Sequence, residues 1–202
     1  MPIKPRECPD VEQRRSPVAA RCFGSIALEV LRSTRVPVVL VNPERTLEPY
    51  RLRRILFPHD GTPTTAAAIG PVLELAERAG ADLLVLHVAS VCRAPTEPGT
   101  LAIPFYVDQP HHEWPAWMRE FLDRLCGVTG AALHHKGMKL ILGCGDPADE
   151  IARVAAEHRA DLVVLAWRGS LAPERAKVAR SVIARSPCPV LVLRVGPQAE
   201  DA

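Results

Sequence analysis

The sequence predicts an α/β fold, a doubly wound sheet of five parallel strands with a helix–strand appendage at its N-terminus. Three observations predict it. Short apolar runs alternate with amphipathic segments through residues 50–196, as in a parallel sheet with helices on both faces. The apolar runs are nearly unbroken, which is typical of strands buried on both faces. An apolar fraction of 48% over 202 residues is enough for one substantial core.

The first half of this domain is predicted to contain two strands and one helix. Residues 55–58 form the first strand and run into the turn sequence His59-Asp60-Gly61-Thr62. Thr64 is predicted to cap a helix that Gly80 ends, and residues 83–88 form the second strand. The residues expected on the inward side of that helix are Ile69, Val72, Leu73, Leu75 and Ala76.

Residues 91–113 interrupt the alternation. They contain four prolines and no clear period, so they are predicted to form a long connection or a lid. A helix over about residues 115–126 is expected to follow, with an apolar stripe that includes Trp117 and Phe121.

The second half is predicted to contain strands over residues 139–142, 162–166 and 190–195. Asp146 is expected to cap a helix with Pro147 at its first position and with Ile151, Val154 and Ala155 inward. A further helix is expected over residues 177–185.

Right-handed crossovers favour a doubly wound sheet. If its strand order is 3-2-1-4-5, the first and fourth strands flank the switch point. Ligands of such sheets bind there, at the carboxyl ends of the strands. Asp60-Gly61-Thr62 and residues 167–170 fall at this place.

The N-terminal part repeats the end of the domain. Residues 24–31 and 36–41 align without gaps on residues 176–183 and 188–193. The matched pairs are Ala27 with Ala179, Val30 with Val182, Pro37 with Pro189 and Val38 with Val190. We interpret this as a duplication of which the first copy has only its last helix and strand, although any helix–proline–strand unit shares some of the pattern. The expected organisation is a partial repeat at 1–49, a complete domain at 50–196 and a tail at 197–202.

The residues of the complete domain resemble the universal stress protein family. The resemblance lies in residues 55–62 (ILFPHDGT), 83–88 (LLVLHV), 143–151 (GCGDPADEI), 161–166 (DLVVLA) with Arg168-Gly169, and 186–193 (SPCPVLVL). It implies a Rossmann-like fold of the adenine-nucleotide α-hydrolase-like group. It also implies ATP or a related adenine nucleotide as ligand.

Nucleotide-binding members of that family share a glycine pattern after the fourth strand: Gly, two residues, Gly, nine residues, then Gly-Ser or Gly-Thr. Such glycines let backbone N–H groups approach phosphates. Here Ala166 stands at the first glycine, Gly169 fits the second, and Ala176-Lys177 stands at the Gly-Ser position. The loop is also about three residues short. The resemblance therefore implies a degenerate adenine-nucleotide site, whose candidate residues are Asp60, Gly61, Thr62, Val88, Gly169 and Lys177. For Asp60 the alternative is a turn residue that accepts hydrogen bonds from nearby backbone N–H groups.

The resemblance also implies a dimer, because the last strand of universal stress proteins commonly pairs with its counterpart in a second subunit. Unpaired edge strands favour such pairing. We expect residues 38–41 to pair antiparallel with residues 190–195, in the same chain or in a partner. The helix over residues 25–33 would then bury Ile26, Val30 and Leu31, and residues 46–50 would be the connector.

Other classes of function have weaker support. The formal net charge of +2 offers no electrostatic case for a nucleic-acid or membrane partner. The pairs His111-His112 and His134-His135 do not form a metal-binding motif, and Gly143-Cys144-Gly145 is only a lookalike of a dinucleotide-binding loop. Six scattered cysteines without metal or disulfide spacing, and no apolar run of about 20 residues, favour a cytoplasmic location.

The sequence therefore predicts a non-catalytic stress-response protein that acts through dimerisation or partner contact, with no certain cofactor and weak binding of ATP or AMP. The alternative is an ATP- or AMP-binding regulatory switch of the same family. An enzyme of the wider adenine-nucleotide α-hydrolase-like group is a third hypothesis.

Overall fold

The computed structural model describes residues 25–34, 36–42, 50–89, 137–167 and 173–195. The described elements are, in chain order, α1 (Ser25–Ser33), β1 (Val38–Leu40), β2 (Arg54–Pro58), α2 (Pro63–Ala79), β3 (Asp82–Ala89), β4 (Met138–Cys144), α4 (Pro147–Glu157), β5 (Leu162–Trp167), α5 (Pro173–Arg185) and β6 (Val190–Arg194). The predicted helix near residues 115–126, the predicted connection at 91–113 and most of the connector at 46–50 lie outside the described residues.

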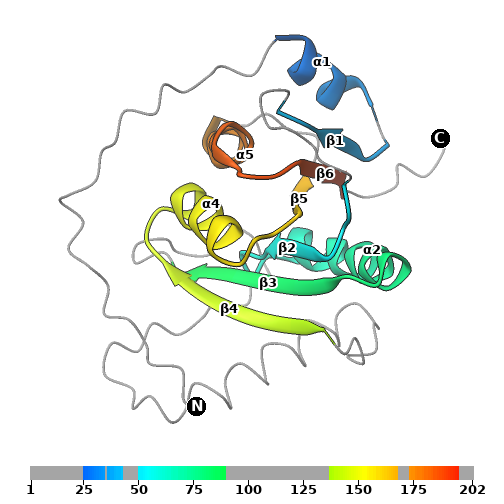
Figure 1. Ribbon diagram of the computed structural model, residues 1–202. Coiled ribbons are helices and arrows are strands. Elements are labelled where there is room, and N and C mark those ends of the chain that lie inside the picture. Colours follow the sequence, from blue (N-terminus) through cyan, green and yellow to red (C-terminus); the bar gives the residue numbers. More distant parts are fainter. Residues whose placement is uncertain (1–24, 35, 43–49, 90–136, 168–172, 196–202) are drawn as a thin grey trace.

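The strands form one sheet in the order β1-β6-β5-β2-β3-β4. The pairs from β6 through β4 are all parallel, and β1 alone pairs antiparallel. In the numbering of the complete domain this is the order 3-2-1-4-5, the one that was considered for the sequence (Figure 1). The doubly wound, Rossmann-like fold is therefore confirmed, with a sixth strand added at one edge.

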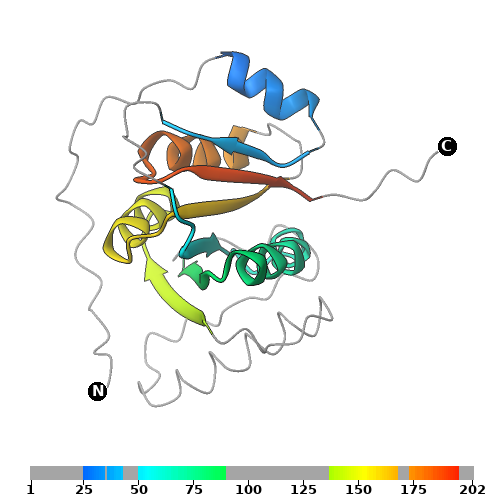
Figure 2. The ribbon, with the colours of Figure 1, turned by 45° about the vertical axis from the view of Figure 1, so that its right-hand side comes forward.

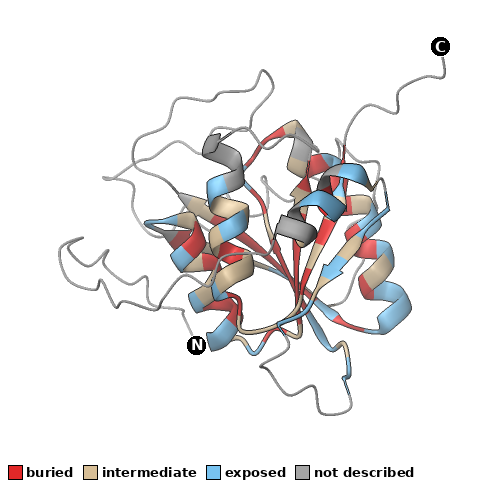
Figure 3. Cartoon of the chain, turned by 90° about the horizontal axis from the view of Figure 1, so that it is seen from above, coloured by how far each residue is buried: buried red, intermediate tan, exposed pale blue. Residues whose placement is uncertain are grey.

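Helices cover both faces of the sheet, and each face has its own apolar core. Ile69 and Val72 of α2 pack with Phe57 and Val164 on one face. Val154 of α4 and Val182 of α5 pack with Leu56 and Val163 on the other. The central strands consequently lie buried between the two helical layers (Figure 3). Most of the predicted inward residues of α2 are buried, whereas Leu75 is only partly so.

The N-terminus of α2 corrects one prediction. The cap is Thr62, which has extended backbone angles and whose side chain accepts a hydrogen bond from the backbone N–H of Thr65 at 3.3 Å. Thr64 cannot be the cap because Pro63, whose fixed φ suits a first helical position, already belongs to the helix. At the other end Gly80 caps the helix with a left-handed φ of +61°, as predicted.

The two later helices agree with the sequence in most respects. Asp146 caps α4 through hydrogen bonds from the N–H groups of Ala148 and Asp149, and Pro147 is the first residue of the helix. Helix α5 begins at Pro173, one turn before the predicted start at residue 177. The prediction was wrong there because residues 173–176 (Pro-Glu-Arg-Ala) carry no apolar period, although a proline is well suited to begin a helix.

The N-terminal appendage lies at the outer edge of the sheet. Strand β1 pairs antiparallel with β6 in the same chain, as Figure 2 shows, so the predicted pairing is confirmed. Leu31 of α1 is buried at 5% exposure, as predicted, whereas Val30 is 44% exposed. The prediction for Val30 was wrong: Leu31 packs in the core, and the side of α1 that carries Val30 faces away from it. The side chain of Ile26 lies outside the described part.

Candidate functional site

The strand order places the switch point between β2 and β5, as predicted. The chain leaves β2 toward β3 on one side, and it leaves β5 toward β6 on the other. The carboxyl ends of β2 and β5 therefore bound the place where sheets of this kind bind ligands. From β2, the residues that reach it are the turn His59-Asp60-Gly61-Thr62 and the first residues of α2.

Asp60 is the main hydrogen-bond acceptor of this turn. Its Oδ1 accepts hydrogen bonds from the Thr62 backbone N–H at 3.0 Å, from the Thr62 hydroxyl at 2.6 Å and from the Thr65 hydroxyl at 2.8 Å. The first of these is the bond of an Asx turn, in which an aspartate side chain closes onto the backbone two residues later. Gly61, buried at a φ of +79°, supplies the left-handed backbone that the turn requires.

These contacts set the charge state of Asp60. Partial burial acts to raise the pKa of its carboxyl group, but hydrogen bonds from Thr62 and Thr65 and the nearby His59 ring lower it. The net effect is a pKa below the ordinary value. At neutral pH the turn thus presents a carboxylate whose Oδ1 is already satisfied by its own turn.

His59 is buried immediately before Asp60, at 2% exposure. Its Nδ1 accepts a hydrogen bond from the Gly61 backbone N–H at 2.8 Å, so the neutral ring carries its proton on Nε2. Burial lowers the pKa of His59 to about 4, against the attraction of Asp60, and His87 lowers it further. The neutral imidazole therefore stabilises the Asp60 turn through the Gly61 N–H. His59 Nδ1, which accepts that hydrogen bond, is not available as a general base.

His87 lies buried on the neighbouring strand β3. Its Nδ1 is 2.8 Å from the His59 carbonyl oxygen, and because a carbonyl only accepts, Nδ1 carries the proton and donates. Burial lowers the pKa of His87, although this hydrogen bond and Asp60 act in the opposite direction. The His59 backbone N–H in turn donates to the Leu86 carbonyl at 2.7 Å. The two histidines thus join the carboxyl ends of β2 and β3.

The other predicted site residues are spread over different places. Val88 is half-buried near the end of β3, on the sheet face that α4 and α5 cover. Gly169 lies outside the described residues. Lys177 is exposed on α5, one turn inside the helix and not at its N-terminus. The structure thus brings Asp60, Gly61 and Thr62 together in one turn and places Lys177 on a separate element.

Sequence reasoning missed His59, His87 and Thr65. The signal for the histidines was the two-residue period of the strands, because His59 continues the buried face of Phe57 and His87 that of Val85. The rings of Phe57 and His59 indeed meet edge-on, with centroids 6.0 Å apart.

Metal binding finds no support in the described part of the chain, which contains no group of three or more His, Cys, Asp or Glu side chains that could hold an ion. The predicted histidine pairs at 111–112 and 134–135 lie outside that part. None of the helices described combines the length and the apolar character needed to cross a bilayer.

Comparison with known proteins agrees with the fold. The model of the universal stress protein family matches residues 51–194. A universal stress protein of Thermus aquaticus, described as lying in the 3′ region of a QAH/OAS sulfhydrylase, is 30% identical over 148 residues, which are 70% of this chain and 98% of that protein. A universal stress protein of Methanocaldococcus jannaschii is 24% identical over 145 residues, which are 70% of this chain and 82% of that protein.

Among solved structures, a universal stress protein from Archaeoglobus fulgidus is similar at a TM-score of 0.57 and 20% identity. The match covers 85% of this chain but only 54% of that one. Because 85% is a larger share than residues 51–194 represent, the likeness in fold extends beyond the family domain. By the family-model match over residues 51–194 and the 30% identity to the Thermus aquaticus protein, this chain belongs to the universal stress protein family.

Proposed function

We propose that the protein is a non-catalytic stress-response protein that acts through contact with a partner, and that its adenine-nucleotide site is degenerate. The observation that carries this proposal is the closed turn at Asp60. Its Oδ1 accepts three hydrogen bonds from Thr62 and Thr65 of its own turn. A ligand that required this oxygen would have to displace bonds that also hold the start of α2.

The phosphate half of the site supports the same proposal. Ala166, at the first glycine position of the family pattern, is the fifth residue of β5 and is half-buried there. A side chain at that position removes the close backbone approach that a glycine would permit. Lys177 and Ala176 lie within α5, where their backbone N–H groups belong to the helix and cannot cradle phosphate oxygens.

The absence of catalysis is part of the proposal. Three groups take part in structural hydrogen bonds. Asp60 Oδ1 accepts from Thr65, His59 Nδ1 accepts from the Gly61 N–H, and His87 Nδ1 donates to the His59 carbonyl. Burial favours the neutral form of both imidazoles. Their arrangement stabilises the turn and presents no nucleophile paired with a base.

The partner contact is proposed to involve the last strand β6. The balanced charge speaks against nucleic acid or a membrane surface as the partner. The scattered cysteines are consistent with a reducing cytoplasm as the place of action.

One observation favours the alternative, a switch that binds ATP or AMP. The N-terminus of α2 lies at the switch point beside a second Asp60 oxygen, Oδ2, to which no described residue donates a hydrogen bond. The exposed Lys177 is a cation that could supply charge to phosphates.

Calorimetric titration with ATP and with AMP tests the proposal. We expect dissociation constants in the high micromolar range or above, a binding free energy of about −5 kcal/mol. Sub-micromolar ATP affinity, or ATP that stays bound through purification, would establish the switch. In that case Lys177→Ala should weaken binding more than Asp60→Ala, because the basic side chain would have replaced the glycine cradle. Arg180→Ala, at another exposed cation on the same helix, is the matched control.

A further inference from the structure

Trp167 is the last residue of β5 and is buried at the switch point, with 8% of its surface exposed. Its indole N–H is buried as well, yet it has no hydrogen-bond acceptor among the described residues. A buried donor without an acceptor costs free energy, so a tryptophan in such a place needs a reason other than its hydrogen bond. The remaining reason is the volume of its large apolar ring system.

The two strands beside the switch point separate before they end. The ladder between β2 and β5 has two pairs and stops at Leu56 and Val163. Both strands nevertheless continue, β2 to Pro58 and β5 to Trp167, and their outer ladders with β3 and β6 reach these last residues. The backbone therefore leaves space between the carboxyl ends of β2 and β5. In a close-packed protein side chains or a ligand fill such a space.

Trp167 belongs to the same row of side chains as two candidate site residues. The register between β2 and β5 places Asp60, two residues beyond β2, level with Trp167, and the register between β2 and β3 places it level with Val88. Val88 and Trp167 lie in one apolar cluster with Leu86 and Leu165, the residues two positions earlier in their strands, on the sheet face that α4 and α5 cover. The row therefore crosses three strands at the carboxyl edge of that face.

Within this row Trp167 is the buried member. Asp60 is exposed and Val88 is half-buried, whereas Trp167 packs among the apolar side chains of its cluster. An indole is a six-membered ring fused to a five-membered ring, and so is a purine, so the two ring systems have similar shapes and areas. The Trp167 side chain therefore fills, beside Asp60, a volume of the size that a purine needs.

We propose that Trp167 determines the specificity of this site by closing it. Its indole occupies, on the β5 side of the row with Asp60 and Val88, the space in which a purine-sized ligand would lie. The indole N–H without an acceptor is tolerated because the ring is held there for its volume. This inference rests on the proposed function, in which the nucleotide site is degenerate, and it names the side chain that excludes the base.

The first test removes the ring in the full chain and uses adenosine as the probe. Adenosine has no phosphate, so the lost glycine pattern does not affect the result. In Trp167→Ala the vacated space should bind adenosine, and we expect calorimetry to show an affinity higher than that of the wild type by about tenfold or more. A Trp167→Ala variant with wild-type circular dichroism and the adenosine affinity of the wild type overturns the proposal.

Two matched variants control for a change in packing alone. Trp167→Phe keeps an aromatic ring at the position, and Leu165→Ala removes a buried apolar side chain from the next row of the same strand and the same cluster. Both should bind adenosine as weakly as the wild type, because the ring at residue 167 still fills the space beside Asp60. An equal gain in affinity for Leu165→Ala overturns the proposal, since any cavity in this cluster would then suffice.

The second test locates the bound adenosine. Free indole has the shape of the removed side chain, so it should displace adenosine from Trp167→Ala in a competition titration. Trp167→Leu, which retains more apolar volume, serves in both tests if Trp167→Ala does not fold. Adenosine that binds equally well in the presence of indole overturns the proposal. Tight binding of ATP to the wild type would contradict the proposed function, whereas failure of these variants to gain affinity contradicts this inference alone.

Discussion

At the scale of single residues, the polar groups of the turn after β2 form hydrogen bonds with one another. The Gly61 N–H donates to His59 Nδ1, the Thr62 and Thr65 hydroxyls donate to Asp60, and His87 donates to the His59 carbonyl. The Gly61 bond requires that His59 Nδ1 keeps its lone pair, and the bonds to Asp60 are stronger while its carboxylate is ionised. The turn is therefore stable only where both conditions hold, above the folded-state pKa values of these groups.

This leads to a prediction of acid sensitivity. The folded-state pKa of His59, about 4, lies below its ordinary value of 6.5, so the unfolded chain binds more protons between these pH values. The free energy of unfolding should be independent of His59 above pH 6.5 and should fall as the pH decreases toward 4, by about 3 kcal/mol in total. Urea denaturation at a series of pH values between 4 and 7 measures this slope.

The variant His59→Asn isolates the contribution of this side chain. Asn Oδ1 lies near the position of Nδ1 and can accept the Gly61 hydrogen bond, but it does not titrate. The stability of His59→Asn should therefore vary less between pH 4 and 6.5 than that of the wild type. His158→Asn, at a half-buried position at the end of α4, controls for the loss of one histidine. If wild type and His59→Asn show the same slope, the buried imidazole is not the sensor.

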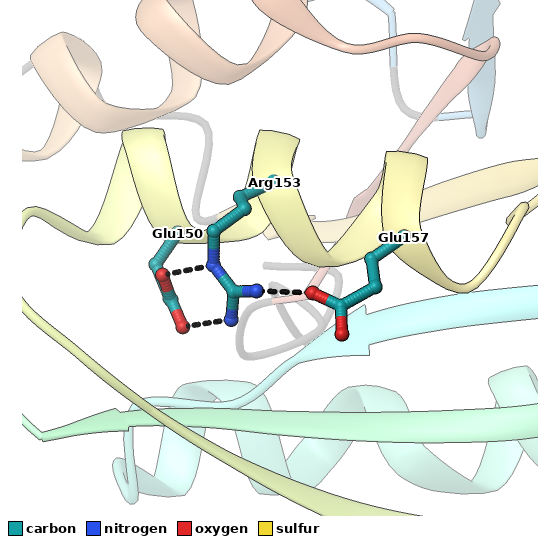
Figure 4. Close-up of polar contacts among 3 residues, drawn as sticks. All are labelled: Glu150, Arg153 and Glu157. Atoms are coloured by element: carbon teal, nitrogen blue, oxygen red, sulfur yellow. Dashed lines mark hydrogen bonds and ion pairs between the residues drawn. The ribbon is translucent and has the colours of Figure 1, made fainter. Parts of the chain in front are cut away.

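At the scale of elements, α4 packs against β4 through the Glu150 side chain. Figure 4 shows Arg153 between two carboxylates, with a bidentate contact to Glu150 and a further contact to Glu157. The Glu150 side chain is only 12% exposed and lies over Gly143 of β4, where a Cβ would come within 2.5 Å of Glu150 Cγ. Gly143 is required there for space, since its φ is not in the left-handed region. The ion pairs with Arg153 hold the Glu150 side chain in a position that only a glycine at residue 143 can accommodate.

Gly143→Ala should consequently destabilise the protein through Glu150. The added methyl group displaces the Glu150 side chain and breaks its bidentate contact, at a cost of about 1 kcal/mol in the free energy of unfolding. In the Glu150→Ala background the same substitution should be neutral or stabilising by about 0.5 kcal/mol, because alanine restricts the unfolded chain more than glycine does. A double-mutant cycle by urea denaturation measures the difference. Additive effects of the two substitutions would show that Gly143 is not required by Glu150.

At the scale of the whole molecule, the appendage completes one edge of the sheet. Without it β6 would present unpaired N–H and C=O groups beside the apolar side chains of Val190 and Val192, a combination that favours association with another strand. The appendage in turn exposes Val30, Val36, Val39 and Val41. The strand at this edge of the sheet is thus the short β1 instead of the longer β6.

Deletion of residues 1–45 should therefore lower the solubility of the protein or convert it to a homodimer. The reason is the newly exposed edge of β6 and the loss of the contacts of Leu31. Light scattering and thermal denaturation of the truncated and the full chain measure the change. A truncated protein with an unchanged mass per particle and an unchanged melting temperature would show that the appendage does not stabilise this edge.

The sequence by itself determined the five parallel strands of a doubly wound sheet, the caps at Asp146 and Gly80, and the pairing of the appendage with β6. The strands and caps follow from apolar periodicity and from glycine and proline positions, which are local properties of the chain. The pairing of the appendage was predicted from the internal repeat and from the resemblance to the universal stress protein family. It also indicated Asp60, Gly61 and Thr62 as one turn, because these residues are adjacent.

Only the tertiary structure decided what the polar side chains of that turn bind and which apolar residues of the appendage stay exposed. His87 donates to a carbonyl 28 residues earlier in the sequence, and Thr62 instead of Thr64 caps α2 because Pro63 already belongs to the helix. Val30 has the same local sequence pattern as the fully buried Val182, yet it is exposed because no strands of its own lie beneath α1. A hydrogen-bond partner or a covering strand that comes from a distant part of the chain leaves no pattern in the local sequence. Contacts with residues distant in sequence, and not the apolar periodicity, therefore determine which of these side chains are buried and what they bind.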